Sequence, residues 1–160
     1  VIEASRGSAN KLKFHPQRRS FELHAVLPLG QSFPYDFGFL PSTRGEDGDP
    51  LDVLVLMDEP VPAGVVVPCR ILGVIRATQA HEGEDDEKRN DRFIAVAAES
   101  QRYRECRSFT DLAASVLDQI EGFFVAYNAR KGVRFRPIGR HGADEALALV
   151  EQGRRAFRKG

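Results

Sequence analysis

The sequence contains few sulfur-bearing residues. Among its 160 residues there is one methionine and there are two cysteines, Cys69 and Cys106, which lie far apart, form no CxxC pair and have no histidine nearby at ligand spacing. This pattern excludes a zinc site built on cysteine pairs and is typical of two structural thiols in a reducing compartment. We therefore predict a cytoplasmic protein.

Long apolar runs and an excess of one charge are also absent. No stretch approaches the roughly 20 apolar residues that a membrane-spanning helix needs, so no membrane partner is expected. Basic and acidic residues number 23 each and give zero net charge at pH 7, so the chain lacks the basic surface of a nucleic-acid binder. Without repeats or low-complexity linkers, residues 1–160 are predicted to form a single domain.

Short β-type runs separated by glycine and proline fill the first two thirds of the chain. They lie at residues 11–14, 19–27, 51–57, 65–76 and 92–98. Many short strands joined by such turns favour a small closed barrel. The charge-dense stretch 81–91 predicts a solvent-exposed loop, at the tip of a hairpin.

The last third has helical periodicity. From Thr110 onward apolar residues recur at steps of three and four, and Thr110 or Asp111 is placed to cap the start of a helix. A second amphipathic helix is predicted over residues 144–159, and residues 132–140 alternate like one more strand. The class is therefore predicted to be α+β, a barrel with helices packed at its side.

An acidic cluster precedes the apolar run at 53–57. In EDGDPLD, the aspartates Asp47, Asp49 and Asp52 fall within six residues. Carboxylates held so close raise one another's pKa unless a cation compensates. Oxygen ligands without histidine or cysteine favour Mg²⁺, with Mn²⁺ as the alternative. The plain alternative is a turn, in which aspartate, glycine and proline are common for local reasons.

The segment FPYDFGFLPSTRGEDGDPLDVLVLMDEPVPAGVVVPCRILGVI, residues 33–75, resembles the core of soluble family I inorganic pyrophosphatases. The likeness extends from the opening VIEAS and GSANK through FFVAYN to the final helix. It implies a five-stranded OB-like β-barrel with flanking helices and Mg²⁺-dependent hydrolysis of pyrophosphate to two phosphates. It also implies a homo-oligomer, because bacterial members of the family are commonly hexamers.

The resemblance assigns roles to individual residues. It implies metal binding by Asp47, Asp52 and the outer carboxylate Glu3, and it makes Asp49 the general base. It implies phosphate binding by Lys11 and Tyr127, and by Arg92 at the position of a family lysine. Three of these residues have plain readings too: Lys11 as the wet face of a strand, Tyr127 as part of a helix core, and Glu3 as an exposed acid.

Several positions depart from the family pattern. Gln79 stands at one metal-ligand position, and a second falls on Asn90 unless the preceding insert shifts the register and delivers Asp91. Phosphate-contacting groups are replaced at Ala25, Phe37 and Asn128, and a glutamate is replaced by Lys13. One reading is a divergent enzyme whose phosphate pocket is rebuilt, with Arg18, Arg19, Arg44 and Arg134 as candidate cations. The other is a catalytically weakened paralogue that binds metal and a phosphorylated ligand or acts as a regulatory subunit.

Overall fold

The computed structural model describes residues 1–81, 83–84 and 86–159. Within them the strands are β1 (Ile2–Ala4), β2 (Asn10–His15), β3 (Ser20–Val26), β4 (Asp36–Phe39), β5 (Asp52–Leu56), β6 (Cys69–His81), β7 (Lys88–Arg89), β8 (Arg92–Ala97) and β9 (Val133–Gly142). The helices are α1 (Ala114–Ala129) and α2 (Ala143–Lys159), and a short 3-10 turn, η1 (Phe109–Asp111), precedes α1.

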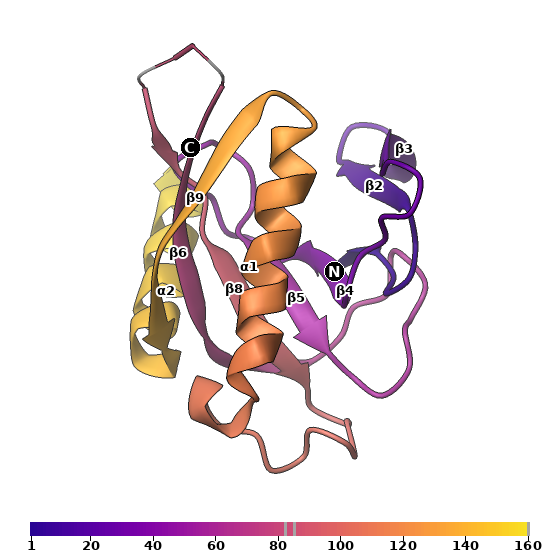
Figure 1. Cartoon of the computed structure of the whole chain (residues 1–160), viewed down its shortest axis with the longest axis vertical. Coiled ribbons are helices and arrows are strands. Elements are labelled where there is room, and N and C mark those ends of the chain that lie inside the picture. The colour runs from indigo at the N-terminus through magenta and orange to yellow at the C-terminus, as the bar shows by residue number, and fades with distance from the viewer. Residues whose placement is uncertain (82, 85, 160) are drawn as a thin grey trace.

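One large sheet organises the molecule. Its strand order is β1-β4-β5-β8-β6-β7, and β9 also pairs with β6. Strands β5 and β8 are parallel, whereas the other pairs are antiparallel. Strands β2 and β3 form a separate hairpin, which stands beside the large sheet in Figure 1.

The two helices enclose two apolar clusters. Along β5, Leu54 and Leu56 belong to the cluster that contains α1, whereas Val53 and Val55 belong to the cluster that contains α2. This alternation follows the two-residue period of a strand. Because both faces of β5 are covered, the residues that follow Asp52 in this strand form a continuous apolar run.

The predicted α+β class is confirmed, but the closed barrel is not found. In the described part of the chain, the pairing path ends at β1 and does not return to the other edge of the sheet. A loop occupies the free edge of β1: Ile2 N–H donates to the Val65 carbonyl at 3.0 Å, and Gly64 N–H donates to the Ile2 carbonyl at 2.8 Å. These bonds satisfy the edge of β1 without another strand.

The helix boundaries are partly as predicted. The second helix is confirmed as α2, but α1 begins at Ala114 and not near Thr110. Asp111 accepts hydrogen bonds from the backbone of Arg107 and Ser108 at 2.7 and 2.9 Å, and so caps η1. Neither helix in the described residues combines the length and apolar character needed to cross a bilayer.

Strand β6 begins at Cys69, later than the predicted start at residue 65, and it continues past the predicted end at residue 76 to His81. Its partners are β7, β8 and β9. The hairpin expected at 81–91 is supported by the antiparallel pairing of β6 with β7, although residues 82 and 85 of its tip lie outside the described residues. Both cysteines are free thiols, as predicted.

Candidate active site

The acidic loop before β5 is a tight turn fixed to the last helix. Gly48 has a φ of +88°, a conformation that favours glycine, and Asp49 N–H donates to the Asp47 carboxylate at 3.1 Å. The Arg44 N–H donates to the carbonyl of Gly153 in α2 at 3.0 Å. A Cβ atom at Gly153 would lie 2.8 Å from the Leu51 side chain. The sequence is therefore a turn by local chemistry and is also held in place by a distant helix.

The three aspartates of this loop have different partners. Asp49 accepts Lys13 Nζ at 3.1 and 3.2 Å, and Asp52 lies 2.7 Å from Arg92 Nη1. No group of three histidine, cysteine or acidic side chains with metal-binding geometry occurs among the described residues. The predicted convergence of all three carboxylates is therefore not formed in this arrangement of side chains.

Two carboxyl groups near Asp52, those of Glu3 and Asp47, have raised pKa values. The pKa of Glu3 is raised to about 6 by burial above all, while Lys11 lowers it and Asp52 raises it. Burial also raises the pKa of Asp47, and Asp52 and Asp49 add to that effect against a backbone hydrogen bond. A hard divalent cation would relieve this repulsion, so the oxygen donors present fit Mg²⁺.

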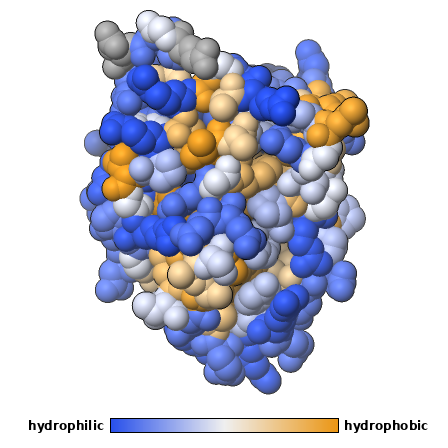
Figure 2. Space-filling model, viewed as in Figure 1, coloured by the Kyte–Doolittle hydropathy of each residue, from blue (hydrophilic) through white to orange (hydrophobic). Residues whose placement is uncertain are grey.

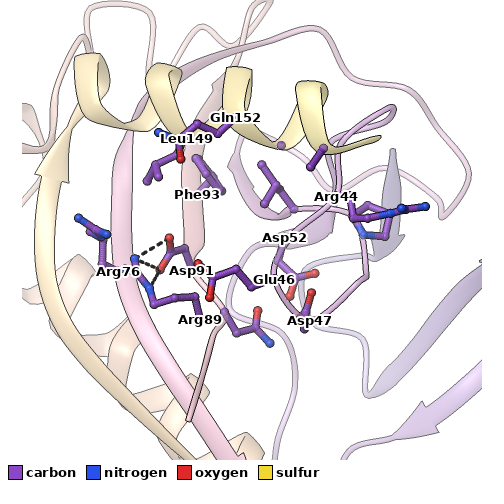
Figure 3. Close-up of a pocket in the computed structure, with 16 residues that line it drawn as sticks. Arg44, Glu46, Asp47, Asp52, Arg76, Arg89, Asp91, Phe93, Leu149 and Gln152 are labelled. Carbon is purple, nitrogen blue, oxygen red and sulfur yellow. Dashed lines mark hydrogen bonds and ion pairs between the residues drawn. The ribbon is translucent and has the colours of Figure 1, made fainter. Parts of the chain in front are cut away.

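A cavity of about 350 Å³ lies between the acidic loop, β6, β8 and α2. Asp47, Asp52 and Glu46 line one side of it, and Asp91 with Arg89 lines another (Figure 3). The Asp91 carboxylate accepts Arg89 Nη2 at 2.7 and 2.9 Å and the Ala77 N–H at 3.0 Å. Asp91 thus ties a neighbouring arginine to the backbone of β6.

The lining of this cavity includes two of the three residues at the uncertain metal-ligand positions. Asn90 and Asp91 both line it, and the Asn90 side-chain oxygen accepts a hydrogen bond from Arg92. Gln79, by contrast, lies in β6 between its partners Lys88 and Phe135 and does not line the cavity.

Arg92 is enclosed by the protein core. Its side chain is 5% exposed and its guanidinium lies 4.7 Å from the ring centroid of Phe124 and 5.0 Å from that of Phe135. The parallel register of β5 and β8 sets Asp52 directly opposite Arg92, and this explains their ion pair. In this position Arg92 holds Asp52 and does not present its charge at the surface.

A second cavity, of about 630 Å³, lies on the other side of Asp52. Its charged lining includes Glu3, Lys11, Lys13, His24, Asp49 and Asp52, and its apolar lining includes Phe14, Phe21, Phe39 and Phe157. Asp52 lines both cavities, and both contain carboxylates, but the basic residues of the first are arginines and those of the second include two lysines of β2. Lys11 Nζ lies 4.8 Å from the ring centroid of Phe37.

The end of α1 supplies a further basic residue. Tyr127 is buried, and its hydroxyl accepts a hydrogen bond from Lys131. Asn128 Nδ2 donates to the Phe124 carbonyl at 2.8 Å, one turn earlier in the same helix. Asn128 is therefore bonded to its own helix, whereas the Lys131 ammonium group lies over the ring of Tyr127.

Only one of the four candidate replacement cations lines the smaller cavity. Arg18 pairs with Glu22 at 2.6 Å and Arg134 with Glu87 at 3.5 Å, Arg44 lines the smaller cavity, and Arg19 is exposed in the β2–β3 turn. Sequence reasoning did not assign a binding role to Lys13, His24 or Lys131. Two signals were available: Lys13 follows Lys11 by two residues in a strand, and Lys131 follows Tyr127 by four.

The site combines an acidic loop at the start of a buried strand with lysines from a separate hairpin. This combination is typical of proteins that bind a highly charged anion. A family model described as inorganic pyrophosphatase matches residues 1–158. An inorganic pyrophosphatase of Nostoc sp. is 35% identical over 158 residues, which cover 99% of this chain and 90% of the relative. One from Thermus thermophilus is 38% identical over 155 residues, covering 96% and 85%.

Solved structures agree with these sequence matches. The crystal structure of inorganic pyrophosphatase from Thermus thermophilus superposes with a TM-score of 0.88 at 36% identity, covering 99% of this chain and 89% of that one. The chain therefore belongs to the inorganic pyrophosphatase family.

Proposed function

We propose that this protein hydrolyses inorganic pyrophosphate to two orthophosphates with Mg²⁺ as the activating ion. Family membership supports the reaction. The observation that carries the proposal is the placement of Asp49, an exposed carboxylate on the acidic loop within 3.2 Å of Lys13 in the cavity that also contains Lys11. A proton acceptor beside cationic side chains is what attack by water on a phosphoanhydride requires.

We infer that Asp47 and Asp52 would hold Mg²⁺, with Glu3 as an outer carboxylate and Asn90 or Asp91 as a further oxygen donor across the smaller cavity. The ion, when bound, supplies screening of the substrate's negative charge and acidifies water in its vicinity. Arg92 neutralises part of the charge of Asp52 and fixes its orientation. It is assigned this positioning role in place of the substrate contact expected from its sequence position.

The proton and phosphate steps fall to residues of the lysine-bearing cavity and its neighbours. Asp49 accepts a proton as the water oxygen bonds to one phosphorus atom, and the bridging P–O bond breaks with its electron pair leaving on the second phosphate. Lys11 and the Tyr127 hydroxyl hold phosphate oxygens and stabilise the charge that develops on the leaving group. A protein that only bound its ligand would have no use for a proton acceptor at Asp49.

Assembly and location are part of the same proposal. We infer a cytoplasmic homo-oligomer, a hexamer by family resemblance, whose contacts include apolar surface near the hairpin. Leu23 and Val26 of β3 and the nearby Leu29 are exposed, and Figure 2 shows apolar side chains gathered at this end of the molecule. We also infer that strands β1, β4, β5, β8 and β6 correspond to the five barrel strands that the resemblance implies.

The test is phosphate release from pyrophosphate across a Mg²⁺ titration, with ATP as a control substrate. We expect Mg²⁺-dependent release that Asp49→Asn lowers by about 100-fold or more, the contribution of a general base. The matched control is Asp144→Asn, at an exposed aspartate of α2, which should retain full activity. Mg²⁺ should still raise the melting temperature of the Asp49→Asn variant.

Two results would contradict the proposal in different ways. Undiminished turnover by the Asp49→Asn variant would refute its role as general base. No release by the parent protein at any Mg²⁺ concentration, with stabilisation by Mg²⁺ intact, would refute hydrolysis and favour a binding or regulatory role.

A further inference from the structure

Two lysines of β2, Lys11 and Lys13, line the cavity that contains Asp49, and a third, Lys131, lies just after the end of α1. We propose that Lys13 and Lys131 bind the phosphate groups of the substrate together with Lys11, an assignment that rests on the proposed function and deepens it. They supply the positive charge that Ala25 and Asn128 lack. Ala25 has no polar side-chain group, and the Asn128 amide donates to its own helix.

Lys13 contacts Asp49, the predicted general base, through a solvent-exposed ion pair. Both oxygens of Asp49 accept its ammonium group, at 3.1 and 3.2 Å, yet the two side chains are 39% and 61% exposed. An exposed pair of this kind contributes little free energy, so the ammonium group can turn to an incoming anion at small cost. Lys13 also lines the larger cavity beside Lys11, which directs that anion toward Asp49.

Within the part of the chain that the structure describes, Lys131 contacts an aromatic side chain and forms no ion pair with an acid. It is exposed after the end of α1, and its Nζ lies 3.9 Å from the ring centroid of Tyr127 and donates to the Tyr127 hydroxyl. Neither contact neutralises its charge. Lys131 therefore places an ammonium group beside the Tyr127 hydroxyl, which is the predicted phosphate contact.

A row of aromatic rings in contact with one another connects Lys131 to Lys11. The Tyr127 ring lies 5.9 Å from that of Phe33, which stacks on Phe37 at 5.4 Å, and Phe37 carries Lys11 at 4.8 Å. Phe33 and Phe37 are buried, so the two ammonium groups lie at either end of a row of packed rings that adds no charge. In Figure 1 the C-terminal end of α1 stands at the level of the hairpin that carries Lys11.

The electrostatic surroundings of His24 agree with this convergence. Partial burial lowers its pKa first, and Lys11, Lys13 and Lys131 lower it further, whereas Asp49 opposes them. Three cations and one carboxylate act on a single imidazole of the β2–β3 hairpin. A polyanion would relieve the repulsion among the cations, which is the property expected of a phosphate site.

The experiment compares Lys13→Gln and Lys131→Gln with the parent in two assays. The first is the KM and kcat for pyrophosphate with saturating Mg²⁺, and the second is orthophosphate binding by isothermal titration calorimetry without metal. Each substitution removes one charge-assisted contact and should weaken orthophosphate binding and raise the KM by about 10-fold or more. Lys13→Arg and Lys131→Arg should recover most of the binding, and Lys159→Gln, at an exposed lysine of α2, is the control.

Each outcome decides the assignment. If the parent turns over pyrophosphate and both glutamine variants keep its KM and its orthophosphate affinity within twofold, the proposal is overturned. If the parent shows no turnover but the glutamine variants still lose orthophosphate affinity, the phosphate site stands and only the reaction fails. A loss of binding that arginine does not recover, accompanied by a lower melting temperature, would assign the lysines a structural role and also overturn it.

Discussion

The ion pair between Arg92 and Asp52 gives a quantitative prediction for Arg92→Met. The Arg92 and Asp52 side chains are 5% and 20% exposed, and the atoms that join them are 2.7 Å apart. Removing one partner of a buried pair costs about 3–5 kcal/mol. Because Asp52 keeps some contact with water, the lower end applies, and methionine retains the apolar contact with Phe124 and Phe135. We expect the free energy of unfolding to fall by about 3 kcal/mol.

The measurement is urea and thermal unfolding without metal. For a chain of 160 residues, a loss of 3 kcal/mol corresponds to roughly 6–12 °C in melting temperature. Arg154→Met is the matched control, because its pair with Glu151 is about half exposed on each side, and its cost should stay below about 1 kcal/mol. Asp52→Asn and the double variant complete a thermodynamic cycle.

A second consequence separates this reasoning from simple loss of packing. Without Arg92, the Asp52 carboxylate loses its cationic partner and becomes a better oxygen ligand. Added Mg²⁺ should therefore stabilise Arg92→Met more than it stabilises the parent protein. A loss below about 1 kcal/mol without metal, or equal stabilisation of both proteins by Mg²⁺, would show that the ion pair does not have the importance assigned to it.

Two further substitutions and one pH dependence can be checked by unfolding experiments. Gly73→Ala should destabilise the fold by at least about 2 kcal/mol, because its Cβ would lie 2.4 Å from the His141 carbonyl oxygen; an unchanged melting temperature would show that β9 gives way easily. Gly122→Ala should stabilise α1 by about 0.5–1 kcal/mol, because a Cβ there meets nothing within 4 Å; a lower melting temperature would contradict this. Hydrogen bonds from residues 100–102 hold the pKa of Asp58 below its ordinary value, so its stabilisation is complete above the ordinary carboxyl pKa of the unfolded chain and is lost as the pH falls through the lowered pKa of the folded state. Asp58→Asn should therefore lower the melting temperature at pH 7 and have little effect in strong acid, and an equal effect at both pH values would refute the assignment.

The predictable part of the fold was the part with a strong local sequence pattern. The run at 53–57 and the helix at 144–159 each had one dominant pattern, and the structure contains β5 and α2 there. The sequence did not reveal that the sheet stays open, because it is backbone groups of the loop around Gly64 and Val65 that cover the edge of β1. Backbone hydrogen bonds of this kind leave no trace in side-chain patterns.

For the candidate site, the sequence located the acidic loop but not the partners of its carboxylates. The opposition of Asp52 and Arg92 depends on the register of a parallel strand pair whose members are distant in sequence. The contact between Asp49 and Lys13 depends on where a separate hairpin lies against the sheet. Register and docking arise from tertiary packing, so residue type and spacing alone could not give them.

The bond between the acidic loop and Gly153 of α2 has a consequence for biosynthesis. The loop leaves the ribosome about 100 residues before the helix that fixes its shape. Proteins of this size commonly pass through intermediates as they fold. A nascent chain that already contains all three aspartates would thus remain inactive until α2 is translated and docks against Leu51.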